Sequence, residues 1–247
     1  MNIKIYVGLN SGLPNLEKSV RKIETQLAAP FLSGKSVEYV ESPKEAFEFP
    51  TLHKCWLDSQ SQGFYGLYLH GKGASKTTDE ELNNGLAWLD YMLVGLLGYG
   101  PTCIDHLNKG ADLVGSMWYR HFKGNCFWFK SSYVRALNNP LHLDVRNRYL
   151  AEYWCSQAYW FNPAVNLPRI KNLFYLPIKT DSDFLPLSEE GYTPNLDQPT
   201  ICNDLSGAIS RNDFSVYDQL YVSSEELEDH KKDLPKYINY DSTIILK

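Results

Sequence analysis

The sequence predicts an α/β fold, in which a sheet is flanked by helices and followed by a C-terminal extension. Two observations predict it. Apolar strand-like runs alternate with amphipathic helical segments through the first 70 residues, and loops rich in Gly, Asn, Ser and Pro follow the strands. Such alternation is typical of a sheet with parallel strands.

The individual elements follow from hydrophobic periodicity. Residues 3–9 are apolar and end in a turn-rich loop, which predicts a buried first strand. Apolar residues recur at helical spacing through 16–27, which predicts a helix with a charged outer face. The same reasoning predicts, in order, a strand at 36–40, a helix at 52–60 and a strand at 64–70.

The downstream elements are predicted in the same way. They are a helix at 80–97, a short helix at 103–107 capped by Thr102, strands at 112–118 and 126–129, helices at 131–137 and 146–159, and a closing strand at 243–246. A boundary near residue 165 would separate a domain at 1–165 from an extension at 166–247. The alternative is that this extension packs on the same core.

Composition excludes several classes of protein. Hydrophobic residues make up 43% of the 247 residues, and the net charge is only -5, so we expect a folded core and no general attraction to nucleic acid. No signal-peptide pattern opens the chain, and the longest apolar run, 91–99, is too short to span a bilayer. We therefore expect a cytoplasmic protein without a transmembrane segment. The five cysteines form no C-x-x-C pair, so we expect reduced, mostly buried thiols.

Aromatic residues are 14% of the chain, and they have two interpretations. They either fill the core or offer faces on which a sugar or base stacks.

The loop His70-Gly71-Lys72-Gly73 follows an apolar strand. In α/β sheets ligands bind beyond the carboxyl ends of strands, and Lys72 and His70 suit a phosphate there. The chain has neither a Walker A motif nor a G-x-G-x-x-G fingerprint. The alternative is an ordinary turn with a solvated lysine.

A second candidate segment begins at His121 and includes Gly124, Asn125 and Trp128. Glycine permits close approach of a ligand, and the Asn125 amide can bind a hydroxyl. Because side chains alternate along a strand, Trp128 and Phe127 face opposite sides, so one is expected in the core and the other lines a site. The alternative is a turn followed by a core strand.

Glu152 is the candidate general base. It lies on the predicted helix among Tyr149, Tyr153 and Trp154, and Arg148 precedes it by one helical turn. A partly buried carboxylate among aromatics would have a raised pKa and could accept a proton. The alternative is a surface ion pair with Arg148.

Metal ligands are weakly indicated. Asp181 and Asp183 resemble a D-x-D motif that would hold Mg²⁺ or Mn²⁺, although acidic pairs are common in loops. The six histidines form no cluster with zinc-ligand spacing, so a zinc enzyme is not expected.

Several spaced motifs within residues 1–160 resemble a family. The matching segments are 48–52 with Trp56, Tyr68-Leu69-His70-Gly71-Lys72-Gly73, Trp88 with Tyr91-Met92, Cys103-Ile104, 112–115, 121–128 and Arg148-Tyr149-Leu150-Ala151-Glu152-Tyr153-Trp154. This arrangement is similar to small glycosyltransferases of the GT-A type from bacterial polysaccharide loci and large algal viruses. It implies a GT-A-like mixed sheet and transfer of a sugar from a nucleotide diphosphate sugar to a saccharide or glycan acceptor.

The resemblance also implies roles for residues. A donor would bind at Gly8, Asn10, Glu41, His70, Lys72 and Gly73, and the acceptor or sugar at His121, Gly124, Asn125, Trp128 and Arg148. Glu152 would be the base of an inverting reaction, with Mn²⁺ or Mg²⁺ as a possible cofactor. This interpretation requires Lys72 and Glu152 to border one cleft. The rival hypotheses are a non-catalytic carbohydrate-binding protein and a protein-interaction module.

Overall fold

The computed structural model describes residues 2–28, 30–116, 118–119, 121–122, 124–155, 170–172 and 243–244. Its elements are β1 (Ile3–Ser11), α1 (Leu16–Leu27), η1 (Pro30–Leu32), β2 (Ser36–Pro43), η2 (Lys44–Ala46), α2 (Phe49–Ser61), β3 (Tyr65–His70), α3 (Asp79–Leu93), the π turn η3 (Val94–Gly98), α4 (Gly100–Asn108), β4 (Leu113–Gly115), β5 (Trp118–Tyr119), β6 (His121–Phe122), β7 (Phe127–Lys130), α5 (Ser131–Arg135), η4 (Pro140–His142), α6 (Arg148–Trp154), β8 (Ile170–Asn172) and β9 (Thr243–Ile244).

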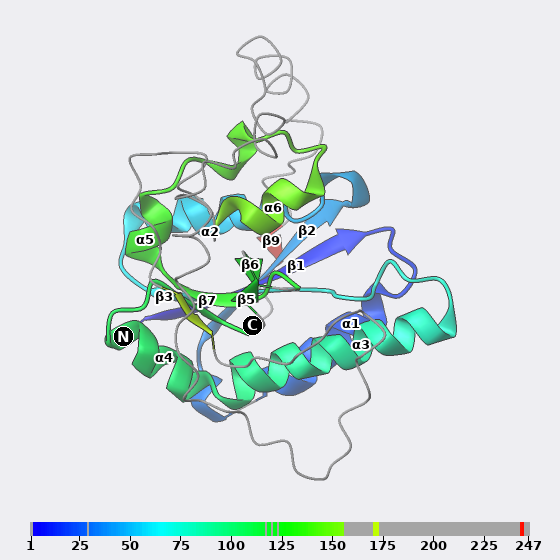
Figure 1. Ribbon diagram of the computed structural model, residues 1–247, viewed down its shortest axis with the longest axis horizontal. Coiled ribbons are helices and arrows are strands. Elements are labelled where there is room, and N and C mark those ends of the chain that lie inside the picture. Colours follow the sequence, from blue (N-terminus) through cyan, green and yellow to red (C-terminus); the bar gives the residue numbers. More distant parts are fainter. Residues whose placement is uncertain are drawn as a thin grey trace.

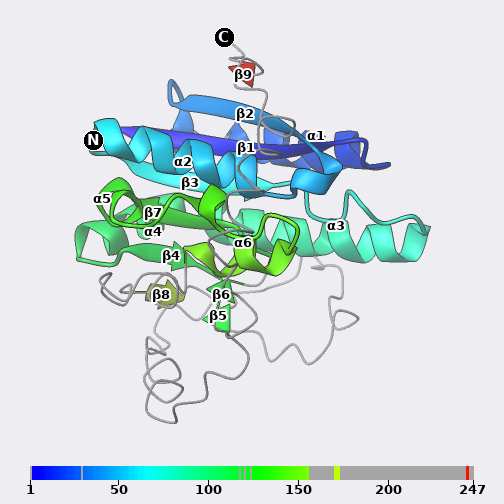
Figure 2. The same ribbon diagram turned by 90° about the horizontal axis from the view of Figure 1, so that it is seen from above.

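The predicted α/β fold with a mixed sheet is confirmed. The sheet has the order β8-β4-β7-β3-β1-β2-β9. β1 pairs in parallel with β2 and β3, whereas β7 runs antiparallel to both β3 and β4. Helices α1, α3 and α4 cover one face, and α2, α5 and α6 cover the other (Figures 1 and 2).

The alternation of side chains along the strands explains this layering. In β1, Ile5 and Val7 enter the core on the α1/α3/α4 face, while Tyr6 between them enters the core on the α2/α5/α6 face. β3 and β7 alternate in the same way, so each strand contributes to both cores. Strands covered on both faces read as nearly continuous apolar runs, which is why periodicity located them.

Helix α3 begins at an N-cap threonine. The Thr78 hydroxyl accepts a hydrogen bond from the backbone N–H of Glu81 at 3.3 Å, and three acidic residues occupy the first turn. Acidic side chains there are favoured by the helix dipole, so the sequence itself determines this start.

Most predicted elements begin or end within a few residues of the observed bounds, and three differences concern caps and strand ends. The helix predicted at 103–107 with Thr102 as its cap begins at Gly100, so Thr102 lies inside it. The strand predicted at 112–118 ends at Gly115, and Trp118 belongs to the separate strand β5. A side chain at position 115 would meet the Phe122 ring, so that position requires a glycine. The helix predicted at 146–159 begins at Arg148, where the Asn147 side chain accepts a bond from the Tyr149 N–H, and residues 156–159 lie outside the description.

The segment after residue 165 returns twice to the main sheet. β8 pairs in parallel with β4 at one side, and β9 pairs antiparallel with β2 at the other. The remainder of 166–247 lies outside the described residues.

Two further expectations can be compared with the described part of the chain. Cys55, Cys103, Cys126 and Cys155 are free and buried, as expected, while Cys202 is outside the description. None of the described helices combines the length and the apolar composition that crossing a bilayer requires.

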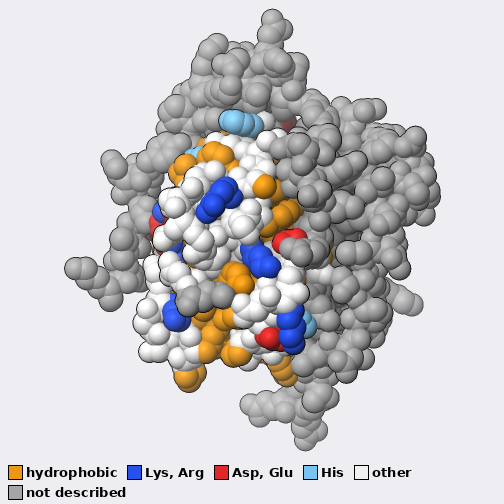
Figure 3. Space-filling model, turned by 90° about the vertical axis from the view of Figure 1, so that its left-hand side faces the viewer, with side chains coloured by type: hydrophobic (Ala, Val, Ile, Leu, Met, Phe, Trp, Pro, Cys, Tyr) orange, Lys and Arg blue, Asp and Glu red, His pale blue; other side chains and the backbone are white. Residues whose placement is uncertain are grey.

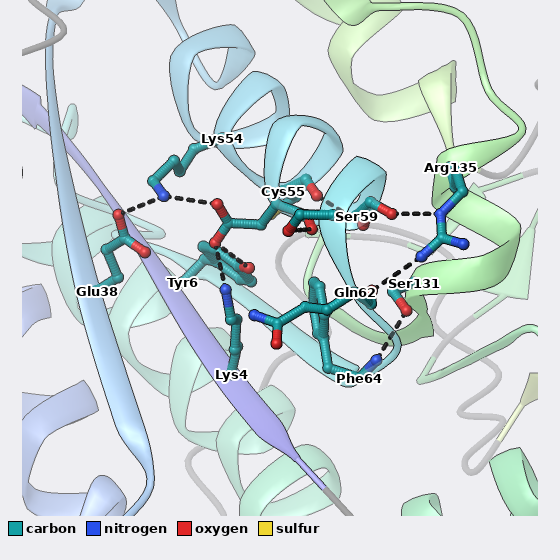
Figure 4. Close-up of polar contacts among 12 residues, drawn as sticks. Lys4, Tyr6, Glu38, Lys54, Cys55, Ser59, Gln62, Phe64, Ser131 and Arg135 are labelled. Atoms are coloured by element: carbon teal, nitrogen blue, oxygen red, sulfur yellow. Dashed lines mark hydrogen bonds and ion pairs between the residues drawn. The ribbon is translucent and has the colours of Figure 1, made fainter.

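A partly buried polar cluster joins α2 to the sheet (Figure 4). Asp58 of α2 accepts bonds from Lys4 Nζ at 2.8 Å, Lys54 Nζ at 2.7 Å and the Tyr6 hydroxyl at 2.8 Å. Burial by itself raises the pKa of Asp58, but these three donors outweigh it and hold the pKa below its usual value. The carboxylate therefore stays ionised between two lysines.

Asp58→Asn should lower the free energy of unfolding by about 2–3 kcal/mol, because it leaves partly buried Lys4 without its counter-charge and leaves Lys54 with Glu38 as its carboxylate partner. Asp105→Asn is the matched control, since Asp105 pairs with Lys109 at the exposed end of α4, where the side chains are 51% and 69% exposed. It should change stability by no more than about 0.5 kcal/mol. Urea unfolding of both variants measures the difference, and equal effects would contradict this account.

Candidate functional site

A pocket of about 590 Å³ lies at the carboxyl ends of β1, β2 and β3. Its wall is formed by residues that precede, follow or face these strand ends: Asn10, Leu13, Lys44, Phe47, Glu48, His70, Gly71, Lys72, Gly73, Ser75, Lys76, Glu81, Asn84, Gly85, Trp88, Arg148 and Glu152. This is the edge of an α/β sheet at which ligands generally bind.

Charged side chains gather at this pocket. Its wall includes three lysines, one arginine and three glutamates. The face at the amino end of β1 shows scattered Lys and Arg side chains and a few Asp or Glu side chains among uncharged and hydrophobic surface (Figure 3). The charged side chains of the pocket wall suit a polar ligand.

Lys72 and Glu152 line this one pocket although they come from opposite faces of the sheet. Lys72 follows β3 and faces α3, whereas Glu152 belongs to α6, which covers the other face (Figure 1). The expectation that these two residues border a common cleft is confirmed. Arg148 of α6 lines the pocket as well, and its guanidinium lies 4.9 Å from the ring centroid of Tyr149, which is 53% exposed.

The turn after β3 depends on close contact between two glycines. Gly73 has a φ of 82°, and a Cβ on Gly85 of α3 would lie 2.7 Å from the Gly73 Cα. Only glycines allow the turn to pack so tightly on α3. This contact brings Lys72 Nζ to 4.0 Å from the ring centroid of Trp88, a cation–π distance. The glycines predicted to admit a ligand therefore also position the lysine.

Glu48 and His70 form an ion pair at the wall of the pocket. The Nε2 of His70 lies 3.5 Å from Oε1 of Glu48 and 2.6 Å from the carbonyl oxygen of Gly124, to which it donates. The second carboxylate oxygen of Glu48 accepts a bond from the amide of Asn125. The imidazole also stacks on the Tyr68 ring, with centroids 6.0 Å apart. The pair is thus held from several sides.

The charge of this pair determines the protonation state of His70. Burial by itself lowers the pKa of His70, but the negative charge of Glu48, helped by Cys126, outweighs burial and the opposing charge of Lys72 and raises the pKa to about 9. The imidazole is therefore a cation at neutral pH.

The pH dependence of stability should reveal this cation. Between the usual pKa of 6.5 and the folded pKa of about 9, the folded protein holds a proton that the unfolded chain has lost, so a rise in pH favours unfolding. The stability advantage of the wild type over His70→Gln should be constant below pH 6.5 and should shrink by on the order of 3 kcal/mol as the pH passes through 9. Urea unfolding from pH 6 to 10 measures it; an advantage independent of pH would contradict the ion pair.

Gly124 and Asn125 were predicted to contact a sugar, but neither residue lines the pocket. Gly124 has a φ of 86°, and a Cβ there would lie 2.2 Å from the Met92 sulfur. Asn125 is 2% exposed, and its amide donates to Glu48 and, at 3.5 Å, to the carbonyl oxygen of Ala151. Both residues lie behind the wall, where they hold Glu48 and His70.

Trp128 does not line the pocket, which corrects the prediction that it binds sugar. Its side chain is fully buried on the α1/α3/α4 face, and its Nε1 donates to the carbonyl oxygen of Leu96 at 2.8 Å. Phe127 faces the other core, as strand alternation predicts, and it is buried too. β7 is covered on both faces, so neither ring is available to a ligand. The side chain of His121 is outside the description.

The predicted donor residues divide into two groups. Asn10, His70, Lys72 and Gly73 line the pocket. Gly8 and Glu41 do not line it: a Cβ on Gly8 would lie 2.9 Å from the Thr51 hydroxyl, so that glycine lets α2 approach β1, and Glu41 is exposed on β2.

Sequence reasoning missed Glu48, Phe47, Lys44 and Trp88 as pocket residues. Glu48 and Trp88 belong to the segments that carry the family resemblance, which is the signal that could have found them. Phe47 has a φ of 50°, which no sequence pattern indicates for a phenylalanine.

No group of three or more His, Cys, Asp or Glu side chains suited to a metal ion occurs among the described residues. Asp181 and Asp183 lie outside them, so that prediction is untested.

The chain matches no protein-family model, no curated protein and no solved structure at a significant level.

Proposed function

We propose that this protein is a glycosyltransferase with a GT-A-like fold, which transfers a sugar from a nucleotide diphosphate sugar to a hydroxyl of a saccharide or glycan. One observation carries the proposal: a lysine and a partly exposed carboxylate from opposite faces of the sheet, Lys72 and Glu152, line one pocket at the carboxyl ends of parallel strands. A transfer reaction needs both a cation near the leaving diphosphate and a base near the attacking hydroxyl.

In the proposed reaction, the acceptor hydroxyl attacks the anomeric carbon of the donor sugar. A new bond forms between the acceptor oxygen and that carbon, the bond from the carbon to the diphosphate breaks, and Glu152 takes the hydroxyl proton. A single displacement of this kind inverts the anomeric configuration.

Lys72 would offset the charge that develops on the nucleoside diphosphate. His70 was assigned the same role from sequence, but its charge is already opposed by Glu48 at 3.5 Å. Lys72 follows the same strand and has no carboxylate partner in the described part of the chain, so the proposal prefers it to His70 as the cation beside the diphosphate. Lys44 and Arg148 line the same pocket. A divalent ion such as Mn²⁺ or Mg²⁺ could share this role.

Donor hydrolysis by the full chain tests the proposal. A panel of uridine, guanosine and thymidine diphosphate sugars is incubated with the protein, with and without Mn²⁺. Slow release of the free sugar from one donor is expected, since water can replace the acceptor. Binding of saccharides without binding or hydrolysis of any nucleotide sugar would contradict transfer and support a non-catalytic carbohydrate-binding protein.

A further inference from the structure

Unusual backbone conformations converge on Glu48. Within the described residues, Phe47 and Asn125 are the non-glycine residues with positive φ, at 50° and 51°. Phe47 directly precedes Glu48, and the amide of Asn125 donates to the Glu48 carboxylate. Asparagine adopts such angles readily, whereas phenylalanine, here with a ψ of -129°, does so only under strain. Backbone strain concentrates where a side chain must be held in one place for function.

Neighbouring side chains maintain the strained residue. The carbonyl oxygen of Phe47 accepts bonds from the Asn10 amide and, at 3.3 Å, from the Ser42 hydroxyl. Both donors lie near the carboxyl ends of β1 and β2, where these strands meet the pocket. The position of Glu48 is therefore determined by two parallel strands from one side and by Asn125 from the other.

The Glu48 carboxylate keeps capacity to accept further hydrogen bonds. Its side chain is 16% exposed and lines the pocket. Oε2 is bonded to Asn125, Oε1 lies 3.5 Å from His70, and the Tyr68 hydroxyl interacts with the same carboxylate. The two carboxylate oxygens together offer about four acceptor positions. Because Glu48 lines the pocket, its remaining acceptor capacity is available to a ligand there.

The surrounding charges indicate which donors it would take. A phosphate is repelled by a carboxylate and is better placed beside Lys72. A cationic group on the ligand is not needed beside Glu48, because His70 already balances the charge of this carboxylate. The ligand groups that suit Glu48 are therefore neutral hydroxyls. The two oxygens of one carboxylate can accept from two neighbouring hydroxyls of a sugar ring.

We propose that Glu48 binds neighbouring hydroxyl groups of the donor sugar and so determines which sugar the pocket accepts. This inference rests on the proposed function. The diphosphate would lie on the Lys72 side of the pocket, and the sugar ring would lie against the wall formed by Glu48 and His70. Glu48 is then a specificity-determining residue, separate from the proposed base Glu152.

The test compares donor analogues that each lack one sugar hydroxyl. The probes are the nucleotide sugar that the wild type hydrolyses, its deoxy analogues and the corresponding nucleoside diphosphate, with dissociation constants measured by calorimetry on the full chain. In the wild type, at least one deoxy analogue should bind tenfold or more weakly than the parent donor. Glu48→Gln should bind the parent and that analogue with equal affinity, and should bind the nucleoside diphosphate within twofold of the wild type.

The control variant is Glu45→Gln, since Glu45 is exposed on η2 and does not line the pocket. It should keep the discrimination of the wild type. If Glu48→Gln does not fold, Glu48→Asp provides the same comparison, because it keeps the negative charge opposite His70 but withdraws the carboxylate from the sugar by one methylene group.

The outcomes separate this inference from the proposed function. Retained discrimination in the folded Glu48 variant would overturn the inference while leaving glycosyl transfer intact. Equal loss of affinity for the sugar nucleotide and for the nucleoside diphosphate would also overturn it, because it would indicate a purely structural role for Glu48. If the wild type binds no nucleotide sugar, the proposed function itself fails.

Discussion

Glu152→Gln is expected to lower the turnover number of sugar transfer by about 10²- to 10⁴-fold, the range that general base catalysis typically contributes. The amide has nearly the shape of the carboxylate but cannot accept the acceptor's proton. Because Glu152 belongs to α6 and the proposed diphosphate contact follows β3, the affinity for the nucleoside diphosphate should stay within a few-fold of the wild type. Steady-state kinetics with saturating donor and acceptor, together with nucleotide titration, measure the two effects separately.

Glu81→Gln serves as the control for loss of a carboxylate near the pocket. Glu81 is 52% exposed and lies 3.8 Å from Lys76, so its charge is solvated and its removal should change turnover only a few-fold. Wild-type turnover in Glu152→Gln would remove Glu152 from the role of base. A similar large loss in Glu81→Gln would instead indicate that any change of charge at this pocket impairs the reaction.

Lys72→Met is expected to weaken binding of a nucleoside diphosphate by about 10- to 100-fold, which corresponds to about 1.4–2.8 kcal/mol. The reason is the loss of a cation that no carboxylate neutralises in the described part of the chain and that the Gly73–Gly85 contact directs toward the Trp88 ring. Methionine keeps the unbranched stem that covers the indole, so the fold should be unaffected. Isothermal titration with uridine and guanosine diphosphate measures the change.

Lys18→Met is the matched control, because Lys18 is exposed on α1 and does not line the pocket. Its nucleotide affinity should equal that of the wild type. The loss in Lys72→Met should also become smaller as salt is added, since screening weakens an ionic contact in the wild type. Unchanged affinity in Lys72→Met would assign the diphosphate to another part of the pocket.

Hydrophobic periodicity predicted most accurately the bounds of elements whose ends depend on local sequence alone. Helix α1 has the predicted bounds of residues 16 and 27, since one apolar stripe and its charged outer face are local properties. The strand predicted at 112–118 ends at Gly115 instead, and no local pattern shows that the ring of Phe122, from a different strand, lies beside this glycine. A packing contact between separate segments leaves no periodic signal in either of them.

The residues of the candidate site also fall into those that a local pattern predicted and those that only tertiary packing placed. Gly73 and Lys72 were recognised because a glycine-rich turn after an apolar strand is a local pattern, and they line the pocket. Trp128 was assigned to sugar because it is a large aromatic beside Gly124-Asn125, yet helices cover its strand on both faces and its indole N–H bonds to Leu96. The identity of a side chain does not show whether another element covers it.

The sequence by itself determined the α/β class, the order of the early strands and helices, and the loop that carries Lys72, because strand and helix periods and turn chemistry are local. Only the tertiary structure decided that Glu152 reaches the same pocket, that Asn125 serves Glu48 rather than a ligand, and that Trp128 belongs to the core. These outcomes depend on which faces two distant segments present to each other. Such contacts arise when the helices close over the sheet, and no single segment contains them.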